Sequence, residues 1–419
     1  MAQRGIREYD GKKVLFTQLS KKFPKALKRS KMLALVTPET KEKDLLKKNP
    51  WLKKIKLVAK PDQLFGKRGK HGLLCVGKKW TETWKWIKSK MNKKVTVGKT
   101  PGILTHFLIE PFTPHKSTEE MYVAIRSYRE YDVIYFSKQG GIFVEENWDK
   151  VKETRIPVLK TSKDVKLNLP ELGKRNKTVE KFVHCLHDLY REGGFAYLEI
   201  NPFTFEGDEI IPLDLVAKLD DTSLIETGHI WGDIEFPSAF GSVSTKEEKF
   251  IKSLDEKSGS SLKLTILNPE GRVWSMVAGG GASVIYADTV CDLGFSKELA
   301  NYGEYSGNPS TEETYQYAKT VLDMMTRRKN SKGKILIIGG GIANFTDVAK
   351  TFTGIIKALT EYRQKLIAGK VKIFVRRGGP NYKEGLANMK NLSKTLGVPI
   401  AVYGPETHMT KIVSMSLKR

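Results

Sequence analysis

The apolar positions of this chain follow two different patterns, one before and one after about residue 240. In the first part, period-two alternation predicts two hairpins, one over residues 120–137 and one over residues 196–218. Between them, apolar residues recur every three or four positions over residues 178–192, which predicts an amphipathic helix. The first part is therefore expected to mix helices with antiparallel strands.

The second part alternates short apolar runs with helical patterns. Four such runs are present: RVWSMVAGG (272–280), KILIIGGG (334–341), VKIFVRRGG (371–379) and PIAVYG (399–404). The helices that follow are expected to begin near Ala282, Asn344, Lys383 and His408. This alternation predicts a doubly wound parallel sheet, in which ligands bind beyond the carboxyl ends of the strands. Because 419 residues are too many for one core, we expect an α/β protein with two domains, residues 1–240 and 241–419.

One stretch of the second part, ILIIGGGIANFTDVAKTF from Ile335, combines a strand, a glycine turn and a helix start. Such an arrangement presents backbone N–H groups and the positive end of a helix dipole to an anion. It is not a dinucleotide fingerprint, because the third glycine of G-x-G-x-x-G would fall on Asn344. It is not a P-loop either, because no G-K-[ST] follows. The sequence therefore predicts an anion site without naming the anion.

Composition limits the classes of partner. A net charge of +25 suits either nucleic acid or an enzyme that acts on small polyanions. The basic residues are spread along the chain and no aromatic–basic RNA-binding signature is present, so we do not expect nucleic acid. Three widely separated cysteines, no uncharged apolar run of about 18 residues and an N-terminus without an apolar segment predict a cytoplasmic protein with no membrane segment.

The first part contains a candidate nucleotide site. Lys60 ends a predicted strand, and residues 62–72 form a loop with three glycines and several basic residues. Glycines let backbone N–H groups approach phosphates, and Lys60 can neutralise them, although a basic hairpin turn has the same composition. Glu110 leaves an apolar strand just before a proline, where it can accept from a nucleotide or form a salt bridge.

A candidate cation site follows in the second predicted hairpin. Glu199 and Asn201 lie two residues apart on one strand, so their side chains face the same way. Asp214 lies on the returning strand. Oxygen ligands on adjacent strands suit Mg²⁺ that bridges nucleotide phosphates, and a plain cross-strand polar pair is the alternative.

These motifs resemble the ATP-grasp domain of acyl-CoA synthetases, and residues 1–240 resemble the nucleotide half of the succinyl-CoA synthetase β subunit. The motifs that carry the resemblance are the basic glycine loop, the Glu after a strand, and E-x-N-P followed by L-D-x-x-A-K. The resemblance implies that ATP is held by Lys60, Arg68, Gly69 and Glu110, and Mg²⁺ by Asn201 and Asp214. Lys67 departs from the closer relatives, which more often carry an arginine there, so the bidentate fork is lost.

The second part resembles ATP-citrate lyase, including its split bacterial and archaeal forms, nearly end to end. This resemblance is carried by four strings: LDEKSGSSLKLTILNPEGR, ANYGEYSGNPS, GGGIANFTDVAKTF and FVRRGGPNYKEGL. Succinyl-CoA synthetase lacks the string RRGGPNY. The resemblance implies that citrate is held by Gly307, Asn344, Thr346, Tyr362 and Arg377, and that a second cation is held by Asp255, Ser258 and Ser260.

The residue chemistry agrees with a tricarboxylate. Citrate needs a bidentate cation together with backbone and hydroxyl donors. Arg377 supplies the guanidinium fork at a strand end, Asn344 and Thr346 are expected at a helix start, and Gly307 admits close backbone approach. The pair Arg376–Arg377 and the segment Asn344–Thr346 argue against a dicarboxylate. The same-fold alternative is a succinate- or malate-specific ligase β subunit, and the alternative of another class is a basic nucleic-acid-binding protein.

The family passes a phosphoryl group through a histidine in the string G-H-A-G-A, which does not occur in this chain. His184 and His187 lie off the apolar stripe of their helix and are expected to face solvent, and His408 is expected to be structural. We therefore expect a hetero-oligomer in which a second subunit carries the phosphohistidine and most of the CoA site. Whether the complex is an ATP-citrate lyase or a citryl-CoA synthetase depends on that subunit, and the reductive TCA cycle is the setting that the resemblance implies.

Overall fold

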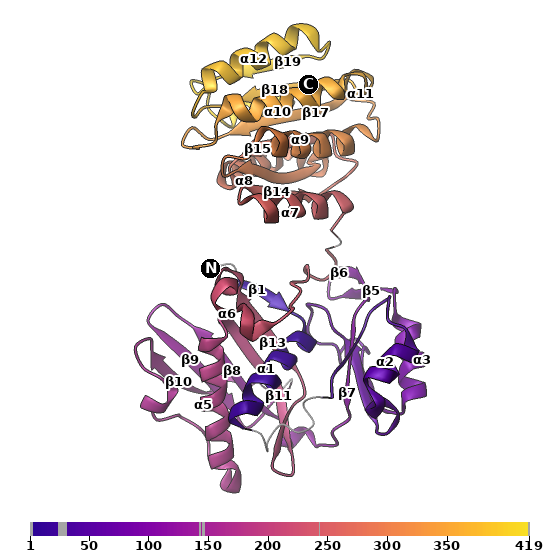
Figure 1. Ribbon diagram of the computed structural model, residues 1–419, viewed down its shortest axis with the longest axis vertical. Coiled ribbons are helices and arrows are strands. Elements are labelled where there is room, and N and C mark those ends of the chain that lie inside the picture. Colours follow the sequence, from indigo (N-terminus) through magenta and orange to yellow (C-terminus); the bar gives the residue numbers. More distant parts are fainter. Residues whose placement is uncertain (1–2, 24–31, 142–143, 145–146, 243, 418–419) are drawn as a thin grey trace. The chain divides into compact units, whose positions relative to one another are not determined.

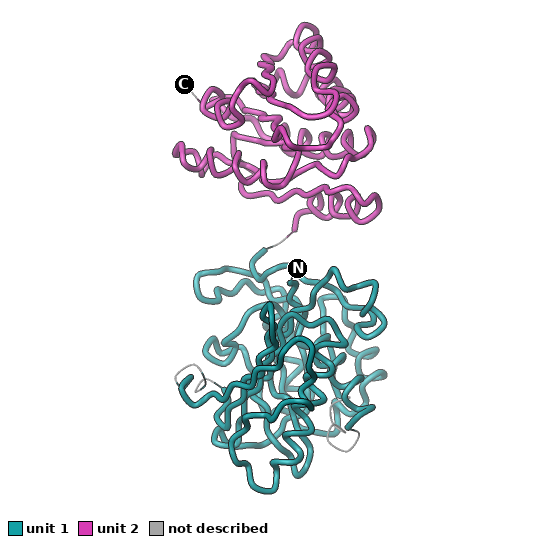
Figure 2. Tube along the Cα trace, turned by 90° about the vertical axis from the view of Figure 1, so that its left-hand side faces the viewer, with its two compact units in different colours: residues 1–242 teal, residues 243–419 magenta. Residues whose placement is uncertain are grey.

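A computed structural model of the chain describes residues 3–23, 32–141, 144, 147–242 and 244–417. Two units divide the chain, unit 1 over residues 1–242 and unit 2 over residues 243–419 (Figure 2). Each unit has its own sheets and its own hydrophobic core.

Unit 1 is built on two antiparallel sheets. The large sheet has the strand order β1-β13-β11-β8-β9-β10, with β12 paired to β11. Its strands are β1 (Gln3–Ile6), β8 (Met121–Ser127), β9 (Tyr131–Ser137), β10 (Lys152–Pro157), β11 (Phe195–Glu206), β12 (Glu209–Pro212) and β13 (Leu215–Asp220). The small sheet has the order β2-β7-β3-β4. Its strands are β2 (Ala34–Val36), β3 (Leu57–Pro61), β4 (Cys75–Lys78) and β7 (Phe107–Pro111), and a separate hairpin consists of β5 (Lys94–Val97) and β6 (Thr100–Ile103).

Helices pack on one face of each of these sheets (Figure 1). Among the described residues, the α-helices of unit 1 are α1 (Glu8–Lys22), α2 (Glu42–Lys48), α3 (Trp80–Lys90), α5 (Asn176–Glu192) and α6 (Leu224–Trp231). Apolar residues of α1 and α5 form one core with the large sheet, and those of α2 and α3 form another with the small sheet. Both predicted hairpins are confirmed, because β8 pairs with β9, and β11 pairs with β12 and β13.

The predicted amphipathic helix is α5, and its apolar stripe is buried. The prediction that His187 faces solvent is wrong, because its side chain is buried and its Nε2 lies 3.0 Å from Asp132 Oδ2. His184 is half-buried, with its Nδ1 2.9 Å from the hydroxyl of Ser162. The contact with Asp132 satisfies Nε2 of the buried His187 ring, whereas its Nδ1 has no hydrogen-bond partner among the described residues.

Unit 2 contains the predicted parallel sheet, and the α/β fold class is confirmed. The sheet has the order β15-β17-β18-β19, with every neighbouring pair parallel. Its strands are β15 (Val273–Ala278), β17 (Lys334–Gly340), β18 (Val371–Arg376) and β19 (Ile400–Tyr403). An antiparallel pair, β14 (Ser261–Ile266) and β16 (Asn301–Ser306), lies beside β15.

Helices cover both faces of this parallel sheet, as expected for a doubly wound fold (Figure 1). The helices of unit 2 are α7 (Lys246–Ser258), α8 (Gly280–Val290), α9 (Thr311–Thr326), α10 (Val348–Glu361), α11 (Arg363–Ala368), α12 (Tyr382–Thr395) and α13 (Lys411–Leu417). Alternate residues of β15 enter two cores. Trp274 and Met276 pack with α9, α10 and α12, whereas Val273 and Val277 pack with α8 and α13.

Candidate functional sites

A cavity of about 770 Å³ opens in unit 1 between the two sheets. All six residues that the sequence assigned to ATP or its metal line this cavity: Lys60, Arg68, Gly69, Glu110, Asn201 and Asp214. They come from β3, the glycine-rich loop after it, the end of β7, β11, and the turn before β13. Because antiparallel pairing of β3 with β7 places Lys60 opposite Leu108, Glu110 comes within reach of the Lys60 ammonium.

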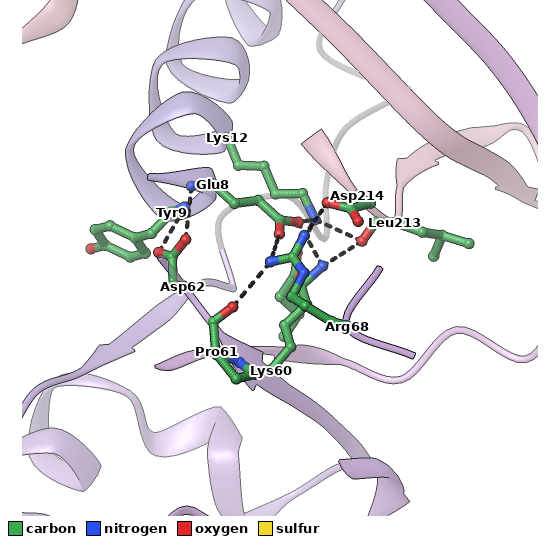
Figure 3. Close-up of polar contacts among 10 residues, drawn as sticks. Glu8, Tyr9, Lys12, Lys60, Pro61, Asp62, Arg68, Leu213 and Asp214 are labelled. Carbon is green, nitrogen blue, oxygen red and sulfur yellow. Dashed lines mark hydrogen bonds and ion pairs between the residues drawn. The ribbon is translucent and has the colours of Figure 1, made fainter. Parts of the chain in front are cut away.

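The ammonium groups of two lysines share the same acceptors inside this unit (Figure 3). Lys60 Nζ lies 2.6 Å from Glu8 Oε1, 3.1 Å from Glu110 Oε2 and 2.6 Å from the Leu213 carbonyl oxygen. Lys12 Nζ lies 2.8 Å from Glu8 Oε1 and 2.6 Å from Glu110 Oε1. Both lysines are buried, so their charges depend on these partners.

Arg68 is the third buried cation of the group. Its Nη1 lies 2.8 Å from Glu8 Oε2 and donates to the Pro61 carbonyl oxygen at 3.1 Å. Its Nη2 contacts the Asp214 carboxylate. Arg68 of the glycine-rich loop thus contacts the carboxylate of Glu8, which also contacts Lys60. The sequence did not reveal this shared contact.

The titration of these groups follows from burial and close charges. Burial alone would raise the pKa of Glu8, but Lys12, Lys60 and Arg68 outweigh it and hold that pKa well below its usual range. Burial would lower the pKa of Lys60, but Glu110 and Glu8 outweigh it and raise that pKa. Burial raises the pKa of Asp62 to about 7, and the nearby Glu8 charge adds to the rise.

The oxygen atoms expected to bind a cation also line the cavity. Asn201 Oδ1 accepts the Gly141 N–H at 2.7 Å, and the Asn201 N–H donates to the Asp214 carbonyl oxygen at 3.2 Å. Glu199 lines the cavity as well. The side chains of Asn201 and Asp214 offer hard oxygen ligands on adjacent segments. Such ligands fit Mg²⁺ whose coordination is completed by phosphate and water. Among the described residues, no three His, Cys, Asp or Glu side chains are grouped to hold a metal by themselves.

Part of the cavity lining is apolar and accessible, with residues from both sheets. Leu74, Val76 and Val216 line the cavity with 39%, 48% and 44% of their surface exposed. Large apolar side chains in such a position suit a flat aromatic ring such as a nucleobase. The cavity therefore pairs an apolar part of its lining with a cluster of buried cations.

Unit 2 contains a different kind of charged group at the carboxyl ends of its strands. Arg377 follows β18, its side chain is fully buried, and none of its three guanidinium nitrogens has a hydrogen-bond partner among the described residues. Burial lowers the pKa of Arg377. A side chain at Gly340, at the end of β17, would collide with the guanidinium, so the glycine is needed for this close approach. An isolated buried cation is costly, and an anion is the partner that compensates it.

The adjacent arginine has a different environment. Arg376 donates from its guanidinium to the carbonyl oxygens of Thr407, Gly340 and Pro405. These three hydrogen bonds tie together the loops after β17 and β19. Arg376 is therefore held by backbone carbonyls, whereas Arg377 has no hydrogen-bond partner for its guanidinium among the described residues, and the discrimination against dicarboxylates stays a prediction.

Asn344 and Thr346 lie before a helix rather than at its first residues. Helix α10 begins at Val348, and its N-cap Asp347 accepts the Lys350 N–H at 2.9 Å. Asn344 Oδ1 accepts the Thr346 N–H at 2.8 Å, which forms a turn. The prediction of a helix from Asn344 is wrong by four residues, because these short polar side chains satisfy the backbone themselves.

Thr346 nevertheless contributes to the polar group around this loop. Its side chain is buried, and its hydroxyl has no hydrogen-bond partner among the residues described. Gly279, just after β15, has φ +101°. A side chain at this position would place its Cβ only 2.9 Å from the Asn344 side-chain nitrogen Nδ2. The loops after β15 and β17 therefore meet at Asn344.

The other two residues assigned to citrate differ in their positions. Gly307 follows β16 with φ +72°, a conformation that favours glycine, and its neighbour Asn308 accepts the Asp347 N–H at 3.4 Å. Tyr362 lies after the last turn of α10, about 20 Å along the helix from Thr346. Its hydroxyl donates to Asp323 on α9 at 3.4 Å. The structure therefore brings Gly307 to this group of loops, but places Tyr362 at the opposite end of α10.

The second expected cation site lies at the end of α7. Asp255 Oδ1 accepts the Leu262 N–H at 2.7 Å, and the hydroxyls of Ser258 and Ser260 lie 2.6 Å apart. The Ser260 Cα would be 3.2 Å from a Cβ at Gly307. These three residues are thus close in space and adjoin the loop of Gly307, with Asp255 and the serines already hydrogen-bonded within the chain.

Several residues of both groups were not found from the sequence. Glu8 and Lys12 are spaced like an exposed i,i+4 helical pair, which gives no sign that both are buried. Tyr305 on β16 and Tyr286 on α8 are buried phenols that interact with the Arg377 charge. Burial raises the pKa of both phenols and the Arg377 charge opposes that rise. Only the sheet order brings these residues to Arg377.

Comparison with protein families covers nearly the whole chain. The model described as "ATP-citrate synthase ATP-grasp domain" matches residues 2–231, and the model described as "ATP citrate lyase citrate-binding" matches residues 242–419. The chain belongs to the ATP-citrate synthase family. The predicted family and the ATP-grasp fold of the first part are confirmed.

Individual members of the ATP-citrate synthase family match along the full chain. Mouse ATP-citrate synthase is 48% identical over all of this chain, which spans 38% of the length of the mouse protein. ATP-citrate synthase alpha chain protein 2 of Arabidopsis thaliana is 46% identical, with 100% of this chain and 99% of the plant protein aligned. ATP citrate lyase from Methanothrix soehngenii, solved in complex with citrate and coenzyme A, matches with a TM-score of 0.92, 55% identity and full coverage of both chains.

Within the described residues, no helix is both long enough and apolar enough to cross a bilayer.

Proposed function

We propose that this chain is the nucleotide- and citrate-binding part of an ATP-dependent, ADP-forming citrate–CoA ligase, within an ATP-citrate lyase or a citryl-CoA synthetase. It binds MgATP in unit 1 and citrate in unit 2. The observation that carries the proposal is the buried Arg377 guanidinium, which has no hydrogen-bond partner among the described residues. Arg377 lies within residues 242–419, which match a family model described as citrate-binding.

The cavity of unit 1 supports nucleotide binding. Lys60 and Arg68 place two cations beside it, and cations of this kind stabilise phosphate oxygens. Gly69 permits close approach of backbone N–H groups, and the apolar part of the lining accommodates the base. Asn201 and Asp214 are suited to Mg²⁺, which would neutralise charge on the transferred phosphoryl group.

The loops of unit 2 support citrate binding. Arg377 can hold one carboxylate through two parallel N–H donors, and Thr346 can donate its hydroxyl. Asn344 and Gly307 lie on the loops that meet beside them. In this group the loop backbone, not the start of α10, supplies the remaining donors, because Asp347 already caps that helix.

The chemistry begins with transfer of the γ-phosphoryl group of ATP to a histidine nitrogen, with ADP as the leaving group. A citrate carboxylate oxygen then attacks the phosphorus, the nitrogen–phosphorus bond breaks, and citryl phosphate forms. The CoA thiolate attacks the carbonyl carbon, and phosphate leaves. In these steps Lys60 and Arg68 hold the nucleotide phosphates, and Arg377 fixes the reacting acid.

The histidine and most of the CoA site belong to a second subunit in this proposal. The family string G-H-A-G-A is not in the chain, and this chain spans 38% of the length of the mouse relative. An Arabidopsis relative of matching length is named an alpha chain, which supports an arrangement in which this part is a separate polypeptide of a hetero-oligomer. Whether the second subunit also cleaves citryl-CoA decides between lyase and synthetase, and the complex is proposed to act in the cytoplasm.

Calorimetric titration of the chain with citrate, and then with succinate, tests the proposal. We expect citrate to bind and succinate to bind more weakly. Arg377→Ala should weaken citrate by about 10- to 150-fold, since a charge-assisted hydrogen bond contributes roughly 1.5–3 kcal/mol. Arg328→Ala, at an exposed arginine of the same unit, is the matched control and should bind citrate normally. Equal binding of citrate and succinate, or unchanged citrate binding by Arg377→Ala, would contradict the proposal.

A further inference from the structure

The two cations beside the nucleotide cavity contact lining residues, namely Glu110 and Leu213 for Lys60 and Asp214 for Arg68, and both also contact one residue behind the wall. Lys60 lies on β3, and Arg68 lies in the loop eight residues later, yet their long side chains share one anchor. That anchor is Glu8, whose Oε1 lies 2.6 Å from Lys60 Nζ and whose Oε2 lies 2.8 Å from Arg68 Nη1. One carboxylate oxygen therefore contacts Lys60, together with Lys12, and the other contacts Arg68.

Glu8 acts from behind these cations. Its side chain is 2% exposed, and it is not among the residues that line the cavity, whereas Lys60 and Arg68 are. Figure 3 shows the Glu8 carboxylate between the two cations and α1. A nucleotide in the cavity would therefore contact the cations and not Glu8.

The position of Glu8 is itself fixed through the backbone. The N–H groups of Glu8 and Tyr9, at the start of α1, donate to the two carboxylate oxygens of Asp62 at 2.8 and 3.1 Å. The Asp62 N–H donates to the His106 carbonyl oxygen at 2.8 Å. Asp62 follows Lys60 by two residues, so the same short segment carries one of the cations and fixes the helix that anchors it.

The carboxylate of Glu8 compensates buried cations, but its charge opposes the binding of phosphate. Glu8, Glu110 and Asp214 match the charges of Lys12, Lys60 and Arg68, so Glu8 offsets positive charge that would otherwise attract phosphate. The ion pairs with Glu8 nevertheless fix the orientation of the two cationic side chains, because a buried side chain held by ion pairs keeps one geometry. We infer that Glu8 is a positioning residue, which aims Lys60 and Arg68 at the nucleotide phosphates. This inference rests on the proposed function.

The test is calorimetric titration of the full chain with ATP plus Mg²⁺, and separately with adenosine. Glu8→Gln keeps the shape of the side chain and removes its charge. We expect it to bind ATP about tenfold more weakly and to bind adenosine as the wild type does. Glu8→Asp keeps the charge on a shorter side chain and should recover part of the ATP affinity. Glu180→Gln, at an exposed carboxylate on α5, is the matched control and should bind both ligands normally.

The two possible roles of Glu8 predict opposite signs. If Glu8 only offset positive charge, Glu8→Gln would bind ATP more tightly, and that result, or an unchanged affinity, would overturn the inference while the proposed function stands. Equal losses of ATP and adenosine would indicate general damage to unit 1 and would also overturn it. If Glu8→Gln does not fold, Glu8→Asp decides, because weakened ATP with normal adenosine supports positioning and normal ATP overturns it. A wild-type chain that binds no ATP would overturn the proposed function and this inference with it.

Discussion

The two units bury their functional cations in opposite ways. In unit 1, Lys60 and Arg68 are paired with carboxylates of the same chain. In unit 2, Arg377 is buried without a hydrogen-bond partner among the described residues. In the first group the charges compensate one another within the chain, whereas the second has no such compensation among the described residues and is proposed to receive it from a bound anion. The same difference predicts that the two groups respond differently when a cation is removed.

The largest expected effect is on the stability of unit 1. Lys60→Met leaves the carboxylates of Glu8 and Glu110 short of one cation, and loss of one partner from a buried ion pair costs about 3–5 kcal/mol. Urea unfolding followed by tryptophan fluorescence measures it, because every tryptophan except Trp274 lies in unit 1. Lys70→Met, at an exposed lysine of the same loop, should change the free energy of unfolding by no more than about 0.5 kcal/mol. A Lys60→Met variant as stable as the wild type would show that the network does not support the fold.

In unit 2, removal of the buried cation is expected to leave the stability of the ligand-free chain unchanged and to weaken its response to citrate. Arg377→Met removes an unpaired buried cation and replaces it with an apolar side chain of similar length, so the ligand-free chain should lose no stability. Added citrate should stabilise the wild type in thermal unfolding, and Arg377→Met should lose most of this stabilisation. The expected loss is roughly 1.5–3 kcal/mol, the contribution of one charge-assisted hydrogen bond. Destabilisation of the ligand-free variant by several kcal/mol would break the comparison, because it would mean that Arg377 is paired within the chain.

The smallest expected effect concerns α10, the helix that follows the loop of Asn344 and Thr346. Asp347→Ala removes the N-cap of α10 and should lower the free energy of unfolding by about 1 kcal/mol at neutral pH. The Lys350 N–H holds the pKa of Asp347 below its usual range, so the cap stabilises the fold above the unfolded pKa and loses this contribution as pH falls through the folded one. The difference between Asp347→Ala and wild type should therefore shrink in acid. Chemical unfolding at neutral and acidic pH measures it, with Asp347→Asn as a control that retains a capping oxygen. A pH-independent difference would show that the charge of Asp347 is irrelevant.

The local patterns of the chain predicted which helices and strands exist better than they predicted where each one begins. Alternation of apolar residues identified β8, β9 and β11, and four runs followed by helices identified the parallel sheet. The start of α10 was misplaced, because Asn344 and Asp347 both favour turns and caps, and only the backbone geometry shows which of them caps the helix.

The candidate sites show the same division. Motifs identified Lys60, Arg68 and Asp214, which all line one cavity, although they are distant in sequence. No pattern identified Glu8, because an acidic residue in a first helical turn is normally exposed. Arg376 and Arg377 are adjacent and chemically identical, yet one donates to three carbonyl oxygens and the other has no partner among the described residues.

The sequence by itself determined the α/β class, the glycine loops at the carboxyl ends of the strands, and the family. These follow from periodicity and local motifs, which depend on neighbours only a few residues apart. Only the tertiary structure decided which charges meet, since Glu8 lies 52 residues from Lys60, and Lys60 lies 153 residues from the Leu213 carbonyl. Partner choice depends on strand pairing and burial, and neither is encoded in any short stretch of the chain.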